Sequence, residues 1–124
     1  MTIASDHAKL DSGPQIIVRV SGGAIIVEGE LRESNAQELE KLLHDFAAET
    51  GSVVKLDLSG LDIEDGAGLA AAINALRRVR ARSSKLVLAR APQMLCHNLY
   101  RLGLLEGRCA IELIDMREDE PTGF

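Results

Sequence analysis

The fold of this chain is decided by residues 53–69, which read VVKLDLSGLDIEDGAGL. Residues 53–58 are expected to form a short β-strand, within which apolar and polar residues alternate from Val54 to Leu58. Asp65 is a favoured N-cap residue and predicts a helix over residues 66–81. Its buried face would carry apolar residues at helical spacing, Leu69, Ile73 and Leu76. Residues 59–64 are expected to form a loop, so the stretch is one strand–loop–helix unit of an α/β fold.

A hairpin and a helix are expected before this unit. Two β-branched runs lie at residues 15–20 and 24–28, and Gly22 and Gly23 between them can supply the positive φ angles of a tight turn. A helix is then expected from about residue 35 to residue 49. Its apolar residues recur at helical spacing and are Leu39, Leu42, Leu43 and Phe46.

Three further elements are expected after the unit. They are a strand over residues 85–89, a helix opened by Pro92 and stopped by Gly103, and a last strand over residues 109–114. The apolar face of that helix would carry Leu95, Leu99 and Leu102.

The resulting order is β-β-α-β-α-β-α-β, which predicts an α/β fold with a mixed sheet of about five strands covered by helices. We expect a flexible N-terminal segment over residues 1–14, one domain over residues 15–115 and a charged C-terminal tail over residues 116–124.

The composition is that of a globular domain: 46% of the 124 residues are hydrophobic, and the net charge is −5. One Tyr, two Phe and no Trp leave few rings for stacking on single-stranded nucleic acid, and the negative charge opposes phosphate backbones. No apolar run approaches the about 20 residues of a membrane-spanning helix, and residues 1–10 lack a signal-peptide core. Cys96 and Cys109 are therefore interpreted as free thiols of a cytoplasmic protein.

No pattern predicts a catalytic centre, a metal site or a cofactor. The histidines and cysteines lack zinc-type spacing, and neither a nucleophile elbow nor a phosphate-binding P-loop is present. Asp62, Glu64 and Asp65 could supply acid–base chemistry, but a solvated acidic loop with a helix cap explains them more simply. The basic run at residues 77–85 is either a docking patch for an anionic partner or a complement to the helix dipole.

The small residues Gly66, Ala67 and Gly68 stand at a helix start, where backbone N–H groups face outward. Glycine in a first helical turn costs stability, so its presence invites an explanation. Either the small residues let another surface, or an anion, approach the backbone closely, or they allow a tight strand-to-helix turn to pack.

Residues 53–61 and 65–69 resemble the STAS domain family, named for sulfate transporters and anti-sigma factor antagonists. That family shows a V-V-x-D-L-S strand followed by a D-S-S-G-L or D-T-x-G-L turn. Further similar pieces are GEL at residues 29–31, KLVL at 85–88 and LGL at 102–104. The resemblance covers residues 16–114 and implies a small α/β domain that binds proteins and is not an enzyme.

The resemblance also implies how such a domain is switched. In the anti-sigma antagonists, a partner kinase phosphorylates the serine after the aspartate of the turn, and the added charge blocks the partner interface. Here Gly66 occupies that phosphoacceptor position and Ala67 follows it, so neither can be phosphorylated. Glu64 and Arg32 are further departures from the family pattern.

The resemblance implies a regulator that binds an anti-sigma factor or a serine-kinase-like ATPase. The partner-binding residues would be Asp62, Glu64, Asp65, Gly66, Ala67, Gly68 and Leu69. The alternative is an accessory subunit that docks on the ATPase of a phospholipid-transport ABC complex, and a small enzyme is a second alternative. We expect no nucleic acid partner and no membrane insertion, and leave open whether the chain forms a homodimer.

Overall fold

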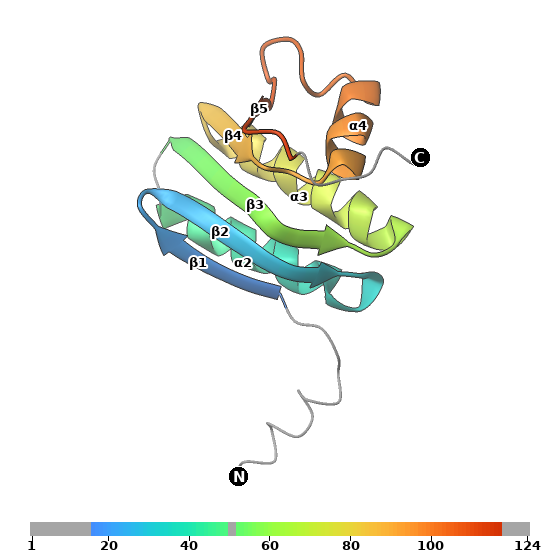
Figure 1. The fold of residues 1–124 in the computed structure, drawn as a ribbon. Coiled ribbons are helices and arrows are strands. Elements are labelled where there is room, and N and C mark those ends of the chain that lie inside the picture. The colour runs from blue at the N-terminus through green and yellow to red at the C-terminus, as the bar shows by residue number, and fades with distance from the viewer. Residues whose placement is uncertain (1–15, 50–51, 118–124) are drawn as a thin grey trace.

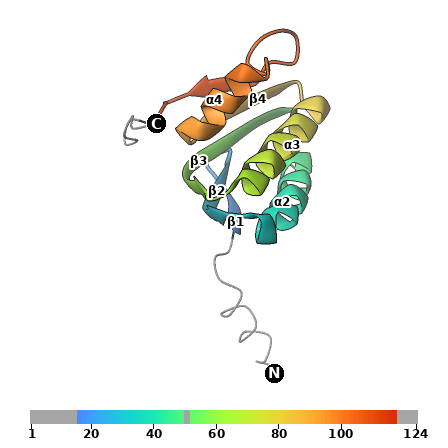
Figure 2. The same cartoon turned by 90° about the vertical axis from the view of Figure 1, so that its right-hand side faces the viewer.

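The computed structural model describes residues 16–49 and 52–117, which form a five-stranded sheet with α2 and α3 side by side on one face (Figures 1 and 2). The elements in chain order are β1 (Ile16–Ser21), β2 (Ala24–Leu31), the 3₁₀ turn η1 (Glu33–Asn35), α2 (Ala36–Glu49), β3 (Val53–Ile63), α3 (Gly66–Arg82), β4 (Lys85–Ala89), α4 (Gln93–Arg101) and β5 (Glu112–Ile114). The predicted N-terminal segment 1–14 and residues 118–124 of the predicted tail lie outside the described residues.

The strands follow one another in the sheet in the order β1-β2-β3-β4-β5. β1 and β2 are antiparallel, and every later neighbouring pair is parallel. Gly22 and Gly23 of the hairpin have φ angles of +59° and +81°, the left-handed values that a tight two-residue turn requires. The predicted α/β class and mixed five-stranded sheet are confirmed.

The core is aliphatic and lies between the sheet and its helices. Ile25, Leu56 and Leu88 pair in one row across three strands, and all three have 0% exposure. The helices add buried residues from their predicted faces, which are Leu39 and Leu43 of α2, Ile73 and Leu76 of α3, and Leu95 and Leu99 of α4. Burial of these side chains is the dominant favourable term in folding.

The predicted loop at residues 59–64 is wrong for all but its last residue, because β3 continues to Ile63. The register between β2 and β3 shifts between Ile26 and Glu28, after which Glu28 pairs with Gly60 and Leu31 with Ile63. A side chain at position 60 would place its Cβ 2.9 Å from Cγ of Glu28, so glycine allows the strands to pair there. The shift breaks the alternation of apolar residues, which is why the pattern alone ends the strand too early.

The end of α4 differs from the prediction at one residue. Gly103, with φ of +74°, follows the helix, and the Leu104 N–H donates to the Leu99 carbonyl over 2.9 Å. This is the glycine-ended C-terminus that the sequence predicts. The turn directs Leu102 outward, where it is 58% exposed, so Leu102 does not belong to the buried face.

The last strand is shorter than predicted, covering Glu112–Ile114 instead of residues 109–114. The guanidinium of Arg80 donates hydrogen bonds to the carbonyl oxygens of Arg108 and Ala110, over 2.9 and 3.0 Å. The N–H of Ile111 donates to the Leu104 carbonyl over 2.8 Å. These groups are bonded to α3 and the turn after α4, so they do not extend the ladder with β4.

The other face of the sheet carries charged pairs. Nη2 of Arg19 lies 3.5 Å from Oε2 of Glu28, and Nζ of Lys85 lies 3.3 Å from Oε1 of Glu112. No helix within residues 16–49 and 52–117 is both long enough and apolar enough to cross a membrane.

Asp57 in β3 makes the acid stability of the fold testable. Burial raises its pKa, but hydrogen bonds from the backbone and side chain of Ser59 and the charges of Arg90 and Lys55 outweigh burial and hold the pKa below its usual range. Because the folded-state pKa is lower than the unfolded one, the ionised carboxylate stabilises the fold above about pH 4, and this stability is lost as the pH falls through the lowered pKa.

We therefore expect Asp57→Asn to flatten the decline of unfolding free energy on the acid side, measured by urea denaturation at a series of pH values. Asp62→Asn, on an exposed side chain of the same strand, is the matched control. An unchanged acid profile in Asp57→Asn would contradict this account of the carboxylate.

Candidate functional site

Asp65 anchors the start of α3. Its backbone is extended, with φ of −149° and ψ of 172°, and its Oδ1 accepts a hydrogen bond from the Gly68 N–H over 2.7 Å. Its Oδ2 accepts a second hydrogen bond from the Glu33 N–H over 3.3 Å. The predicted N-cap is confirmed, and the same carboxylate also ties α3 to the first residue of η1.

Gly68 brings α3 against the end of β2. A Cβ at this position would lie 2.8 Å from the carbonyl oxygen of Leu31 and 3.1 Å from Oδ1 of Asp65. The Leu31 carbonyl also accepts a hydrogen bond from the Glu64 N–H over 2.9 Å. Gly68 is buried, so this glycine serves the packing of the turn and does not face a partner.

Gly66 and Ala67 face outward. Among the described residues, no heavy atom beyond its chain neighbours comes within 4 Å of a Cβ built on Gly66, and both residues are exposed. Of the two explanations for the small residues, packing thus applies to Gly68, and open access to the helix start applies to Gly66 and Ala67. Leu69 is half-buried and packs against the core.

Acidic side chains surround this open helix start. Asp62 has a side-chain exposure of 67%, and Glu64, Asp65 and Glu33 are also exposed. Negative charge near a helix N-terminus complements the dipole of the helix. The structure thus brings the predicted residues 62–69 together as one surface, which we call the α3-start surface: an open Gly66–Ala67 step with an acidic rim.

The turn η1 belongs to this surface, although the sequence did not single out Glu33. Asn35 holds η1 in place, since its Oδ1 accepts from the Arg32 N–H and its Nδ2 donates to the Glu30 carbonyl, both over 2.8 Å. Nη2 of Arg32 in turn lies 3.3 Å from Oε1 of Glu30. Glu33 is far from Asp65 in the chain, and no local pattern links the two residues.

Arg117 supports the surface from behind and was also missed. Its guanidinium donates to the carbonyls of Leu58, Ser59 and Leu61 at 2.6, 3.1 and 2.7 Å, and its Nη1 lies 4.0 Å from Asp62. The side chain is only 8% exposed. The packed part of the chain therefore reaches Arg117, within the segment that the sequence assigns to the tail.

The chemistry of the α3-start surface suits binding. Its outward groups are carboxylates and backbone, and among the described residues no group of three His, Cys, Asp or Glu side chains is arranged to hold a metal ion. Burial raises the pKa of the Cys96 thiol, and the charge of Arg117 only partly offsets this. Cys96 is thus a protonated, buried thiol, and Cys109 is exposed.

A protein-family model described as "Mlab, STAS domain" matches residues 19–114, from within β1 to the last residue of β5. A comparison with curated proteins finds no significant match.

The double role of Asp65 predicts a specific cost for its removal. Asp65→Ala should lower the free energy of unfolding by about 1–2 kcal/mol, because the Gly68 and Glu33 N–H groups lose their acceptor. Asp62→Ala removes an equal charge from an exposed neighbour and should stay within about 0.5 kcal/mol of the wild type. Urea denaturation measures both, and equal effects of the two variants would refute the anchoring role.

Proposed function

The chain belongs to the STAS domain family, and on that premise we propose that it is a protein–protein interaction module that docks on a partner through the α3-start surface. STAS domains are generally interaction domains without enzymatic activity. The proposal assigns the contacts to the exposed residues Asp62, Glu64, Gly66 and Ala67, while Asp65, whose carboxylate is bonded within the turn, holds the helix start in place. Gly68 and Leu69 support them from below.

The proposal rests on one observation: the exposed residues Gly66 and Ala67 lie on a turn that hydrogen bonds and close packing hold in place. Gly66 and Ala67 project no side chain beyond a methyl group, so a partner can approach the helix backbone closely. Beneath them, Asp65 and Gly68 hold the turn against η1 and β2. A surface that keeps its shape before binding loses less conformational freedom on association.

The acidic rim favours a partner that carries basic side chains. Glu33, Glu64 and Asp62 are exposed around the step, and opposite charges across an interface raise the association rate and select against acidic partners. Gly66 and Ala67 carry no hydroxyl, so this binding is not switched by phosphorylation at the position that the family uses.

For the partner, we propose an anti-sigma factor or a serine-kinase-like ATPase, as in the anti-sigma factor antagonists. The second candidate is an accessory subunit on the ATPase of a phospholipid-transport ABC complex. Such a subunit needs no phosphorylation cycle, although its turn carries a threonine that this chain lacks.

Substitution at the step tests the docking surface. Ala67→Arg should weaken partner binding at least about ten-fold, because the bulky cation blocks the step and opposes basic groups on the partner. Asn74→Arg is the matched control, since it adds the same charge at an exposed position two turns along the same helix. Tagged protein is used for capture from soluble and membrane fractions of its native cells, read by mass spectrometry.

Recovery of a kinase-like ATPase or a sigma-controlling protein by the wild type, but not by Ala67→Arg, would support the first partner class. Recovery of ABC-transporter subunits with the same dependence would support the second. Equal recovery of the same partner by Ala67→Arg and Asn74→Arg would show that docking uses another surface.

A further inference from the structure

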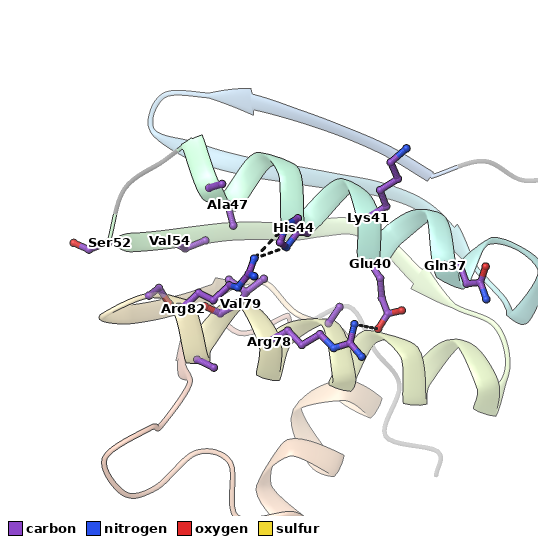
Figure 3. A pocket seen from close by; sticks show the side chains of 14 residues that line it. Gln37, Glu40, Lys41, His44, Ala47, Ser52, Val54, Arg78, Val79 and Arg82 are labelled. Carbon is purple, nitrogen blue, oxygen red and sulfur yellow. Dashed lines mark hydrogen bonds and ion pairs between the residues drawn. The ribbon is translucent and has the colours of Figure 1, made fainter.

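A groove of about 1170 Å³ runs between α2 and the C-terminal half of α3 (Figure 3). Its base is apolar and consists of three buried residues from two elements, Val54 of β3 and Ala75 and Val79 of α3. Small residues line it further along both helices, namely Ala47, Ala48 and Ala81. None of its described lining residues is Phe, Tyr or Trp, and the imidazole of His44, which is bonded to Arg82, is the ring among them.

The rim of the groove is basic. Lys41, Arg78 and Arg82 line it together with His44, and the acidic residue in the lining is Glu40. Three permanent cations against one anion give this face a positive charge, although the whole chain carries a net charge of −5. The groove therefore differs in sign from the α3-start surface.

The contacts that cross the groove leave its cations available. Nη1 of Arg78 lies 3.8 Å from Oε2 of Glu40, and the two side chains are 77% and 27% exposed, so this long ion pair holds the guanidinium only weakly. Arg82 crosses to α2 by placing its Nη1 2.6 Å from Nδ1 of His44 (Figure 3). An imidazole carries no negative charge, so this contact does not neutralise the charge of Arg82.

This arrangement separates the members of the basic run at residues 77–85. Arg80 turns away from the groove and is bonded to carbonyls of residues 83, 108 and 110. Arg78 and Arg82 are four residues apart, which places both on one face of the helix, toward α2. Arg80 thus has a structural role. Arg82, in the last turn of α3, also complements the helix dipole, but Arg78 and Arg82 both place their charge toward α2.

We propose that the α2–α3 groove binds an acidic amphipathic helix of a protein partner. The lining of α2 extends from Gln37 to Ala48, about 16 Å at the helical rise, which matches three turns of a bound helix. An apolar base receives the apolar stripe of such a helix, and small side chains let it approach closely. The cations on the rim then meet carboxylates on the flanks of the bound helix.

This inference does not depend on the docking of the α3 start. Along α3, Ala67 lies about 12 Å from Ala75, where the groove lining of this helix begins, and about 24 Å from Ser83, where it ends. A single copy of the domain therefore presents an acidic surface at one end and a basic groove along the other part of the same helix. Two partners, or two parts of one partner, can be bound at once.

The test uses the full chain and a fluorescent designed peptide of about 14 residues, or four turns, with leucine and alanine on one face and glutamate on the other. A twin peptide has lysine in place of every glutamate. Fluorescence anisotropy should show saturable binding of the acidic peptide and at least roughly ten-fold weaker binding of the twin. Binding of the acidic peptide should weaken as salt is added.

Variants locate the binding. Arg78→Glu combined with Arg82→Glu should weaken binding of the acidic peptide at least roughly ten-fold. Ala48→Trp, which fills the groove without changing charge, should weaken it by roughly five-fold or more. Arg101→Glu, at an exposed position of α4, is a control that reverses a charge away from the groove and should bind like the wild type. Thermal melts confirm that each variant is folded.

Three results would overturn the proposal. The first is no saturable binding of the acidic peptide up to about 1 mM, at the weak end of the affinity scale. The second is equal affinity for both peptides, or for the wild type and the Arg78/Arg82 double variant. The third is cosedimentation with anionic phospholipid vesicles that the acidic peptide does not displace, which would assign the basic groove to a lipid surface.

Discussion

The carboxylate of Asp65 is the interaction on which the functional end of this fold depends. One oxygen closes the first turn of α3 at Gly68, and the other holds the N–H of Glu33 in η1. The missing side chain of Gly68 completes the joint, because it lets the helix approach the Leu31 carbonyl of β2. The end of β2, η1 and the start of α3 thus meet at one point.

Because these stabilising contacts lie between the elements that meet there, the outward-facing side of the α3 start is not needed to hold the fold together. Gly66 and Ala67 are exposed at the step, and the surrounding carboxylates point to solvent. The opposite half of α3 has the reverse character, with Arg78 and Arg82 facing α2 across an apolar groove. The fold uses one helix to present two chemically distinct surfaces, an arrangement suited to a domain that connects proteins.

Local patterns were enough to predict much of this structure. The βα unit, the glycine hairpin, the cap at Asp65 and the end of α4 each follow from neighbours in the chain. What the sequence missed depends on distant contacts: β3 continues past Leu58 because it pairs with β2 after a register shift, and β5 is short because Arg80 binds the carbonyls before it. Likewise, Glu33 and Arg117 join the candidate site across the fold, and no spacing in the sequence signals their contacts.

The central claim is that the α3 start is the surface on which a partner docks. Hydrogen–deuterium exchange of the full chain, alone and with its captured partner, tests this claim directly because it reports each backbone amide without any substitution. The account predicts slower exchange on binding at residues 64–69 and in η1, where the helix start would be covered. Unchanged exchange at these residues, with protection elsewhere on the domain, would contradict it.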